Sequence, residues 1–159
     1  MAIITLNNNS LSGVTALPAG VGGKVLQVVN NNYTTYTTTG STSVWVTASQ
    51  CDITVQNASS YIQLLANFAI NTVNSNAVYR IDKIISGART TLYTAPNLFY
   101  RNNNAGFVDE YPFMNYYFAH GSSIGTTITL ETQVRFGGGT GTINLNSAAT
   151  SFTTLMEIA

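Results

Sequence analysis

The segment Gly121-Ser-Ser-Ile-Gly125 has the G-x-S-x-G spacing of the turn that presents a nucleophilic serine in many hydrolases. Such a turn needs a strand before it, a helix after it, and a histidine and an acid further along the chain. Here residues 126–136 alternate like a strand, and His120, the only histidine, lies immediately before the motif. The segment therefore predicts a five-residue hairpin loop and gives no support for a hydrolase.

Two other segments could hold an anion or supply an acid and a base. No lysine follows Gly137-Gly-Gly-Thr-Gly141, and residues 142–145 resemble a strand, so no helix dipole would face a phosphate. We interpret this segment as a flexible turn. Asp109 and Glu110 are adjacent and would point to opposite sides of an extended chain, which favours a solvated loop. No pair of acids has the pattern of a glycosidase, so we expect no enzymatic activity.

Metal and thiol chemistry are equally weakly indicated. One histidine cannot make a metal site in a monomer, although three copies of His120 could meet on a threefold axis. A histidine satisfied by hydrogen bonds is the simpler interpretation. Cys51 is the only cysteine, so an intrachain disulfide is excluded and a small buried apolar residue is expected. We predict no cofactor and no metal.

The composition excludes several classes of partner. Only 8% of the chain is charged, with six basic and six acidic residues, so no net field attracts nucleic acid or an anionic membrane. A surface of hydroxyls and amides is easily desolvated, which suits a subunit that packs against copies of itself. The apolar runs are too short for a membrane span, and the N-terminus lacks the basic region of a signal peptide. We expect synthesis and folding in a cytoplasm.

From Lys24 onward the hydrophobic pattern has a period of two. Two segments alternate most clearly. In the first, the predicted inward residues are Ile62, Leu64, Ala66, Phe68 and Ile70, and the outward ones are Tyr61, Gln63 and Asn67. In the second, the predicted inward residues are Ile128, Leu130, Val134 and Phe136, and those on the opposite side are Glu131, Gln133 and Arg135. Residues 77–85 also fit a helical stripe. Eight to ten short strands in 24–159 predict an all-β fold, a single jelly roll or β-sandwich whose last residues form a strand.

Residues 1–23 follow neither period and end in a segment rich in proline and glycine. We expect an extended N-terminal arm that docks onto another subunit or another protein through its apolar residues, which are Ile3, Ile4, Leu6, Leu11, Val14 and Leu17. A tuck of the arm against its own domain is the open alternative.

Aromatic residues crowd into 93–118 between asparagine-rich turns. Such side chains are typical of subunit interfaces and also of surfaces that bind sugars. We assign the trimer interface or a ligand surface to Tyr61, Tyr111, Phe113, Tyr116, Tyr117 and Leu155. Both interpretations stay open.

Two segments carry a resemblance to a known family. Gly22-Gly-Lys-Val-Leu-Gln-Val-Val29 and the closing Thr153-Thr-Leu-Met-Glu-Ile-Ala159 resemble the first and last strands of a domain found at the C-terminal ends of tail-fibre and other virion proteins of tailed phages, notably phages of cyanobacteria and marine bacteria. The resemblance covers 22–159 and implies a jelly roll similar to complement and tumour-necrosis-factor trimers, with paired terminal strands. The stretch Arg89–Tyr111 replaces a short family loop, so no ligand residue is transferred.

The resemblance implies a virion surface protein, and the chain lacks the heptads and repeats of a fibre shaft. Our first hypothesis is a homotrimeric capsid decoration, or cement, protein that contacts the major capsid protein or other virion proteins. In this hypothesis the arm from Ile3 to Leu17 attaches the trimer to the viral shell. The alternative is a tail-fibre or receptor-binding knob that recognises host surface glycan.

Overall fold

The computed structural model describes residues 24–72, 75–100, 108–139, 141–146 and 150–159. Every regular element in these ranges is a β-strand. In chain order the strands are β1 Val25–Tyr33, β2 Thr37–Thr39, β3 Val46–Thr54, β4 Tyr61–Asn67, β5 Ile70–Thr72, β6 Ser75–Ile85, β7 Ala88–Tyr100, β8 Val108–Glu110, β9 Phe113–Ala119, β10 Thr127–Gly139, β11 Ile143–Leu145 and β12 Ser151–Ile158. The prediction of an all-β fold is confirmed.

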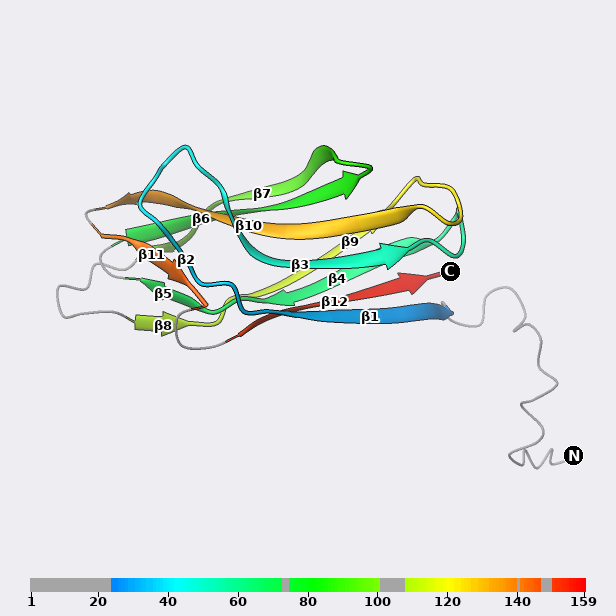
Figure 1. The fold of residues 1–159 in the computed structure, drawn as a ribbon, viewed down its shortest axis with the longest axis horizontal. Coiled ribbons are helices and arrows are strands. Elements are labelled where there is room, and N and C mark those ends of the chain that lie inside the picture. Colours follow the sequence, from blue (N-terminus) through cyan, green and yellow to red (C-terminus); the bar gives the residue numbers. More distant parts are fainter. Residues whose placement is uncertain (1–23, 73–74, 101–107, 140, 147–149) are drawn as a thin grey trace, which may run out of the picture.

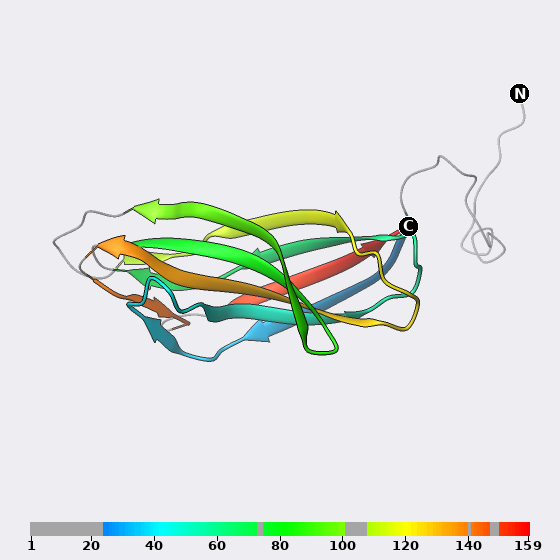
Figure 2. The same ribbon diagram turned by 90° about the horizontal axis from the view of Figure 1, so that it is seen from above.

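The strands form two layers (Figures 1 and 2). One layer is the sheet β1-β12-β4-β9, here called the first sheet, and the other is β3-β10-β6-β7, the second sheet. A short sheet, β2-β11-β5-β8, continues the first sheet. Along the chain β2 follows β1, β5 follows β4, β8 precedes β9 and β11 precedes β12, so the strands of the short sheet have the same order as those of the first sheet. Two packed sheets with strands that cross repeatedly between them make a jelly roll. The first and last strands pair antiparallel from Val25 with Ile158 to Tyr33 with Ser151.

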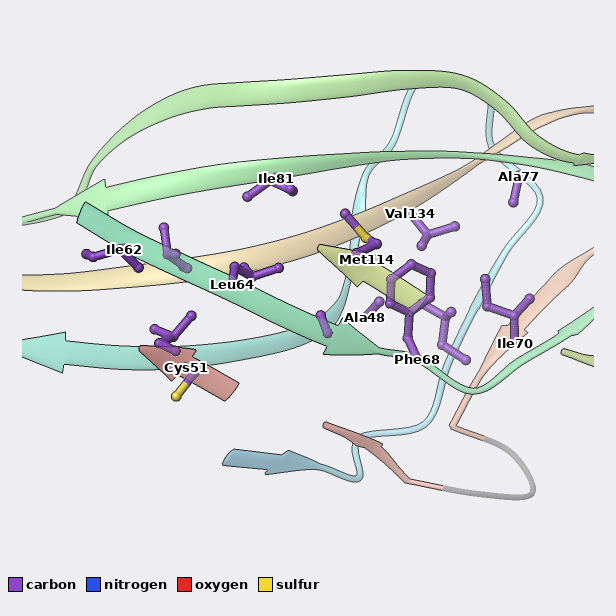
Figure 3. Packing of buried hydrophobic residues seen from close by; sticks show 14 of the residues in the cluster. Ala48, Cys51, Ile62, Leu64, Phe68, Ile70, Ala77, Ile81, Met114 and Val134 are labelled. Carbon is purple, nitrogen blue, oxygen red and sulfur yellow. The ribbon is translucent and has the colours of Figure 1, made fainter. Parts of the chain in front are cut away.

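The core lies between the two layers and follows the predicted alternation (Figure 3). Ile62, Leu64 and Ala66 of β4 are fully buried, whereas Tyr61 on the same strand is exposed. In strand β10 the residues predicted to face inward are buried, as expected. Glu131 and Gln133 on its outward side are buried as well, so that side is not exposed to solvent as the alternation predicted. Side chains of the neighbouring strands cover these two residues, so the outer face of β10 is a polar layer and not open water.

Three local expectations are corrected by the strand pairing. The loop 121–125 is not a hairpin, because β9 belongs to the first sheet and β10 to the second. Gly137–Gly139 end strand β10, where Gly138 and Gly139 pair with Asn76 and Ser75, so this part of the glycine run is not a free turn. Residues 108–110 form β8, paired with β5, and not a loop. The ambiguous residues 77–85 are strand β6.

Candidate functional site

The outward side of the first sheet carries no charge. Antiparallel register aligns its outward residues in four rows, each contributed by β1, β12, β4 and β9 in turn: Val25, Ile158, Tyr61 and Ala119; Val28, Met156, Gln63 and Tyr117; Asn30, Thr154, Leu65 and Asn115; Asn32, Phe152, Asn67 and Phe113. We call these sixteen positions the uncharged face. Every position holds an apolar, aromatic, amide or hydroxyl side chain.

Large apolar side chains are unusually exposed on this face. Six of the eleven such residues in the described part of the chain lie there, namely Phe113, Val28, Tyr117, Val25, Tyr61 and Phe152. Their exposed fractions run from 61% for Phe113 to 41% for Phe152. Contiguous exposed apolar surface of this kind marks an interaction site.

The face is held in one conformation by contacts across its strands. Tyr61 and Tyr117 stack with ring centroids 4.9 Å apart and planes 8° from parallel. Gln63 donates from Nε2 to Asn115 Oδ1 at 3.1 Å, and Asn67 donates to the Tyr111 carbonyl at 3.0 Å. A surface that is already ordered loses little side-chain entropy when a partner covers it.

The outward side of the second sheet, in contrast, is rich in charged residues of both signs. It carries Asp52, Arg80, Asp82, Arg89, Glu131 and Arg135, half of the six basic and six acidic residues of the chain. Arg89 Nη1 lies 2.6 Å from Asp82 Oδ2 and 2.5 Å from Glu131 Oε2, and Arg80 Nε lies 3.0 Å from Asp82. Burial alone would lower the pKa of Arg89, but its hydrogen bonds to the two carboxylates and their charges raise it. Half of the charge of the molecule is therefore confined to one layer.

Trp45 extends this charged layer at the start of β3. The guanidinium of Arg80 lies 4.5 Å from the Trp45 ring centroid, and that of Arg135 lies 5.0 Å away. Arg135 also donates to the Thr42 carbonyl. Cation–π contacts stabilise both cations against the ring face, so the two arginines are structural.

His120 belongs to a buried hydrogen-bond cluster with Ser60 and Glu157. The Ser122 backbone N–H donates to His120 Nδ1 at 3.0 Å, so the ring proton is assigned to Nε2, which faces Ser60 Oγ at 3.0 Å and the Asn57 carbonyl at 3.1 Å. Ser60 Oγ in turn donates to Glu157 Oε1 at 2.6 Å. A protonated Nε2 cannot accept the serine proton, so this cluster is not a nucleophilic dyad. The prediction of a hydrogen-bonded histidine is confirmed.

Glu157 is the centre of that cluster and is fully buried. Besides Ser60, it accepts hydrogen bonds from Gln27 Nε2 at 2.5 Å and from the backbone N–H groups of Gln56 at 3.0 Å and Asn57 at 2.9 Å. Burial raises the pKa of Glu157, but these hydrogen bonds outweigh it and hold the pKa below its ordinary value. The carboxylate ties β12 to β1 and to the loop before β4. Sequence inspection missed this residue, whose only signal was an acid on the inward side of a strand.

A groove of about 350 Å³ opens along one side of the sandwich, between residues of β6 and β7 in the second sheet and of β9 in the first. Its walls are aromatic, aliphatic and amide side chains: Tyr79, Ile81, Tyr93, Phe113, Met114, Asn115 and Tyr116. Ring centroids lie 6.1 Å apart for Tyr79 and Tyr93 and 5.8 Å apart for Tyr93 and Tyr116. Burial raises the pKa of Tyr79, and the charge and hydrogen bond of Tyr93 raise it further. We call this site the aromatic groove.

The structure places the predicted surface residues unevenly. Tyr61, Tyr111, Phe113 and Tyr117 are exposed, with Tyr111 52% accessible just before β9. Tyr116 is half-buried, and its hydroxyl donates to the Leu92 carbonyl at 3.1 Å.

The expectation of a surface position for Leu155 is wrong. Leu155 is fully buried, because β12 turns Thr153, Leu155 and Glu157 inward and Phe152, Met156 and Ile158 outward. Of the six large exposed apolar residues on the uncharged face, sequence inspection did not assign Val25, Val28 and Phe152. The predicted attachment residues Ile3, Ile4, Leu6, Leu11, Val14 and Leu17 lie outside the described residues.

The described residues include no group of three or more histidine, cysteine, aspartate or glutamate side chains placed to hold a metal ion. They also include no helix long and apolar enough to cross a membrane.

Comparison with known proteins identifies no family. No family model matches the sequence, and no curated protein matches it. Among solved structures, the VP2 subviral particle of infectious bursal disease virus superposes with a TM-score of 0.42 at 15% identity, over 83% of this chain and 39% of that one. Latent PorU from Porphyromonas gingivalis superposes with a TM-score of 0.40 at 11% identity, over 87% of this chain and 14% of that one. The chain thus spans well under half of these proteins, and such distant likeness assigns no function.

Proposed function

We propose that the chain is a virion structural protein, a homotrimeric capsid decoration protein whose subunits meet through the uncharged face. The observation that carries the proposal is the separation of charge between the two layers. One layer exposes six large apolar side chains and no charge at its sixteen outward positions, while the other carries half of the charged residues. Copies of such a molecule can pack first sheet to first sheet without burying an unpaired charge.

Several features support identical copies as the partner. A surface without charge meets its own copy without like-charge repulsion, whereas a strongly charged partner would lose hydration and gain no ion pair. The stacked pair Tyr61 and Tyr117 offers the ordered aromatic anchor that dominates many protein interfaces. A trimer encloses three such faces around one axis and leaves three charged second sheets toward solvent.

The virion setting rests on the resemblance of the two end segments to phage virion proteins. Their strands, β1 and β12, are hydrogen-bonded neighbours, so segments from opposite ends of the chain form one structural unit. That pairing is the arrangement the resemblance implies.

Matched charge insertions test the interface. Val28 is 55% exposed on the uncharged face, and Val44 is 56% exposed outside it. The Val28→Glu variant would place three carboxylates at the trimer contact and should dissociate the trimer, whereas Val44→Glu should leave its mass unchanged. Equal effects of the two substitutions, or no effect of either, would exclude this face.

The shell attachment is tested separately. A variant that lacks residues 1–17 should remain a folded trimer and lose binding to capsids that the full chain decorates. Decoration by the truncated trimer would contradict the role of the arm.

A receptor-binding knob that recognises host glycan is a second candidate function. One observation favours it: the aromatic groove, a recess walled by three tyrosines at a side of the molecule.

A further inference from the structure

We infer that the aromatic groove is a binding site for one neutral pyranose ring, held by stacking on tyrosine faces and by hydrogen bonds from the rim. The inference deepens the second candidate function and rests on it. It does not depend on the decoration role or on trimer formation.

The shape of the groove sets the size of the ligand. Its volume of about 350 Å³ lies at the lower end of the range for small-molecule sites, roughly 300–1,000 Å³. Such a space accommodates a single sugar ring with some of its solvent. Because the groove opens along the side of the sandwich, the ring could belong to the end or to the middle of a chain.

The walls set the chemistry. Tyr79, Tyr93 and Tyr116 form a series of tilted rings, which offer flat apolar faces to the C–H side of a sugar. The Tyr116 hydroxyl is tied to the Leu92 carbonyl at 3.1 Å, so this ring is fixed before any ligand arrives. Tyr93 is the most accessible of the three, with 42% of its surface exposed.

Polar groups on the rim match sugar hydroxyls. Asn115 lies where the groove meets the uncharged face, and its Oδ1 accepts a hydrogen bond from Gln63, which leaves its Nδ2 group as a donor. The Tyr93 side chain is hydrogen-bonded to that of Tyr79 within the groove. None of the seven lining residues carries a charge, so the groove has no partner for the carboxylate or sulfate of an acidic sugar. These features together select a neutral, hydroxylated, flat ligand.

The chain provides its own reporters for a binding measurement. The Met114 side chain lines the groove, and Met156 lies on the uncharged face of the first sheet. In the full chain labelled with ¹³C-methyl methionine, methyl β-D-glucopyranoside, methyl β-D-galactopyranoside and methyl α-D-mannopyranoside are each titrated to about 100 mM. At least one pyranoside should shift the Met114 resonance saturably with a Kd in the millimolar range, as expected for a ligand of this size, and leave Met156 unmoved.

Two tyrosines of equal exposure provide the matched variants. Tyr93 in the groove and Tyr61 on the uncharged face are each 42% exposed, so the same substitution removes a ring of equal exposure inside and outside the groove, and the mass of the Tyr61→Ser variant reports separately on the trimer contact proposed for this ring. Tyr93→Ser should weaken the pyranoside at least tenfold, Tyr93→Phe should weaken it less, and Tyr61→Ser should leave it unchanged.

Three results would overturn the inference. The first is no movement of Met114 with any of the pyranosides. The second is an equal response to the acyclic alcohol sorbitol, or a response to cyclohexanol alone, either of which would mean that no sugar ring is recognised. The third is a Met114 shift that depends on protein concentration without sugar, which would mean that a second copy fills the groove. The mass of the protein in the same samples reports on the trimer independently, so failure of one proposal is distinguishable from failure of the other.

Discussion

Replacing Glu157 by glutamine should strongly destabilise the fold, although the two side chains have almost the same shape. The carboxylate accepts hydrogen bonds from Ser60, Gln27 and two backbone N–H groups and is fully buried. The amide keeps one acceptor oxygen and turns an N–H₂ group toward donors, so about two of these bonds are lost. Hydrogen bonds to a charged group contribute about 1.5–3 kcal/mol each, and we expect a loss of about 3–5 kcal/mol in the free energy of unfolding.

Urea unfolding at one fixed subunit concentration measures this loss, because stability of an oligomer depends on concentration. With a denaturant slope of about 2 kcal/mol per molar, the midpoint should fall by about 1.5–2.5 M urea. Asp52→Asn is the control, since Asp52 is an exposed carboxylate, and its free energy of unfolding should stay within about 0.5 kcal/mol of the parent value. A Glu157→Gln midpoint that matches the control would refute the reasoning.

The same variant predicts a pH dependence. The pKa of Glu157 is lowered in the folded chain from the ordinary value of 4.5. The unfolded chain therefore binds the proton at a higher pH than the folded chain does, and the stabilisation by this carboxylate is complete above about pH 4.5 and lost as pH falls through the folded pKa. The gap in stability between parent and Glu157→Gln should be constant near neutral pH and narrow below pH 4.5. If the difference in stability between the parent and Glu157→Gln grew on acidification, the pKa of Glu157 would be raised by folding and not lowered, which would contradict this prediction.

Three further predictions concern other parts of the structure. Arg89→Ala removes the cation that bonds buried Asp82 and Glu131. Because Arg89 is 39% exposed and Arg80 also pairs with Asp82, the substitution should cost about 1–3 kcal/mol in the free energy of unfolding, measured with urea; a loss below about 0.5 kcal/mol would mean that the two carboxylates do not need this cation. Gly137→Ala would bring a Cβ to 2.7 Å from Asn76 Oδ1 and 3.0 Å from Val78 Cγ2, and should lower the free energy of unfolding by about 1–3 kcal/mol; an unchanged free energy of unfolding would show that β6 and β10 move apart at this point without cost. Burial, with a smaller contribution from the charge of Asp52, raises the pKa of Cys51 to about 11, so a thiol reagent at pH 8 should modify it only as fast as the chain unfolds; rapid modification of the native protein would contradict its buried position.

The fold was largely predictable because its strands alternate cleanly. The inward residues of β4 appear in sequence as an unbroken period of two, and they form the centre of the core. Residues 77–85 were ambiguous because isoleucines and valines fit both periods. Ser86 and Gly87, which follow, both adopt positive φ, of 49° and 82°, and form a two-residue turn between β6 and β7. A Ser-Gly pair after such a run is a hairpin signal that would have resolved the ambiguity.

The candidate site was less predictable because it depends on which strands become neighbours. Alternation separates the two sides of β12 but does not say which side faces the core, so Leu155 was placed on the surface and Phe152 was overlooked. The inward side of β12 carries Thr153 and Glu157, which look solvated in sequence. Ser49 and Thr132 meet Thr153 in the interior, with hydroxyl oxygens 2.6–2.7 Å apart around Ser49 Oγ, and their mutual hydrogen bonds allow this polar side to be buried.

The uncharged face likewise emerges only from register. Its rows combine residues as distant in sequence as Val28 and Met156, and each strand alone looks like an ordinary half-polar strand. The absence of charge is a property of the four strands together and not of any one segment.

The central claim is that identical copies cover the uncharged face of the first sheet. Sedimentation equilibrium of the purified full chain, at several micromolar concentrations, tests this claim most directly. The account predicts a species of three times the 17.0 kDa chain mass that persists on dilution. A single species at the mass of one chain over the whole concentration range would contradict it.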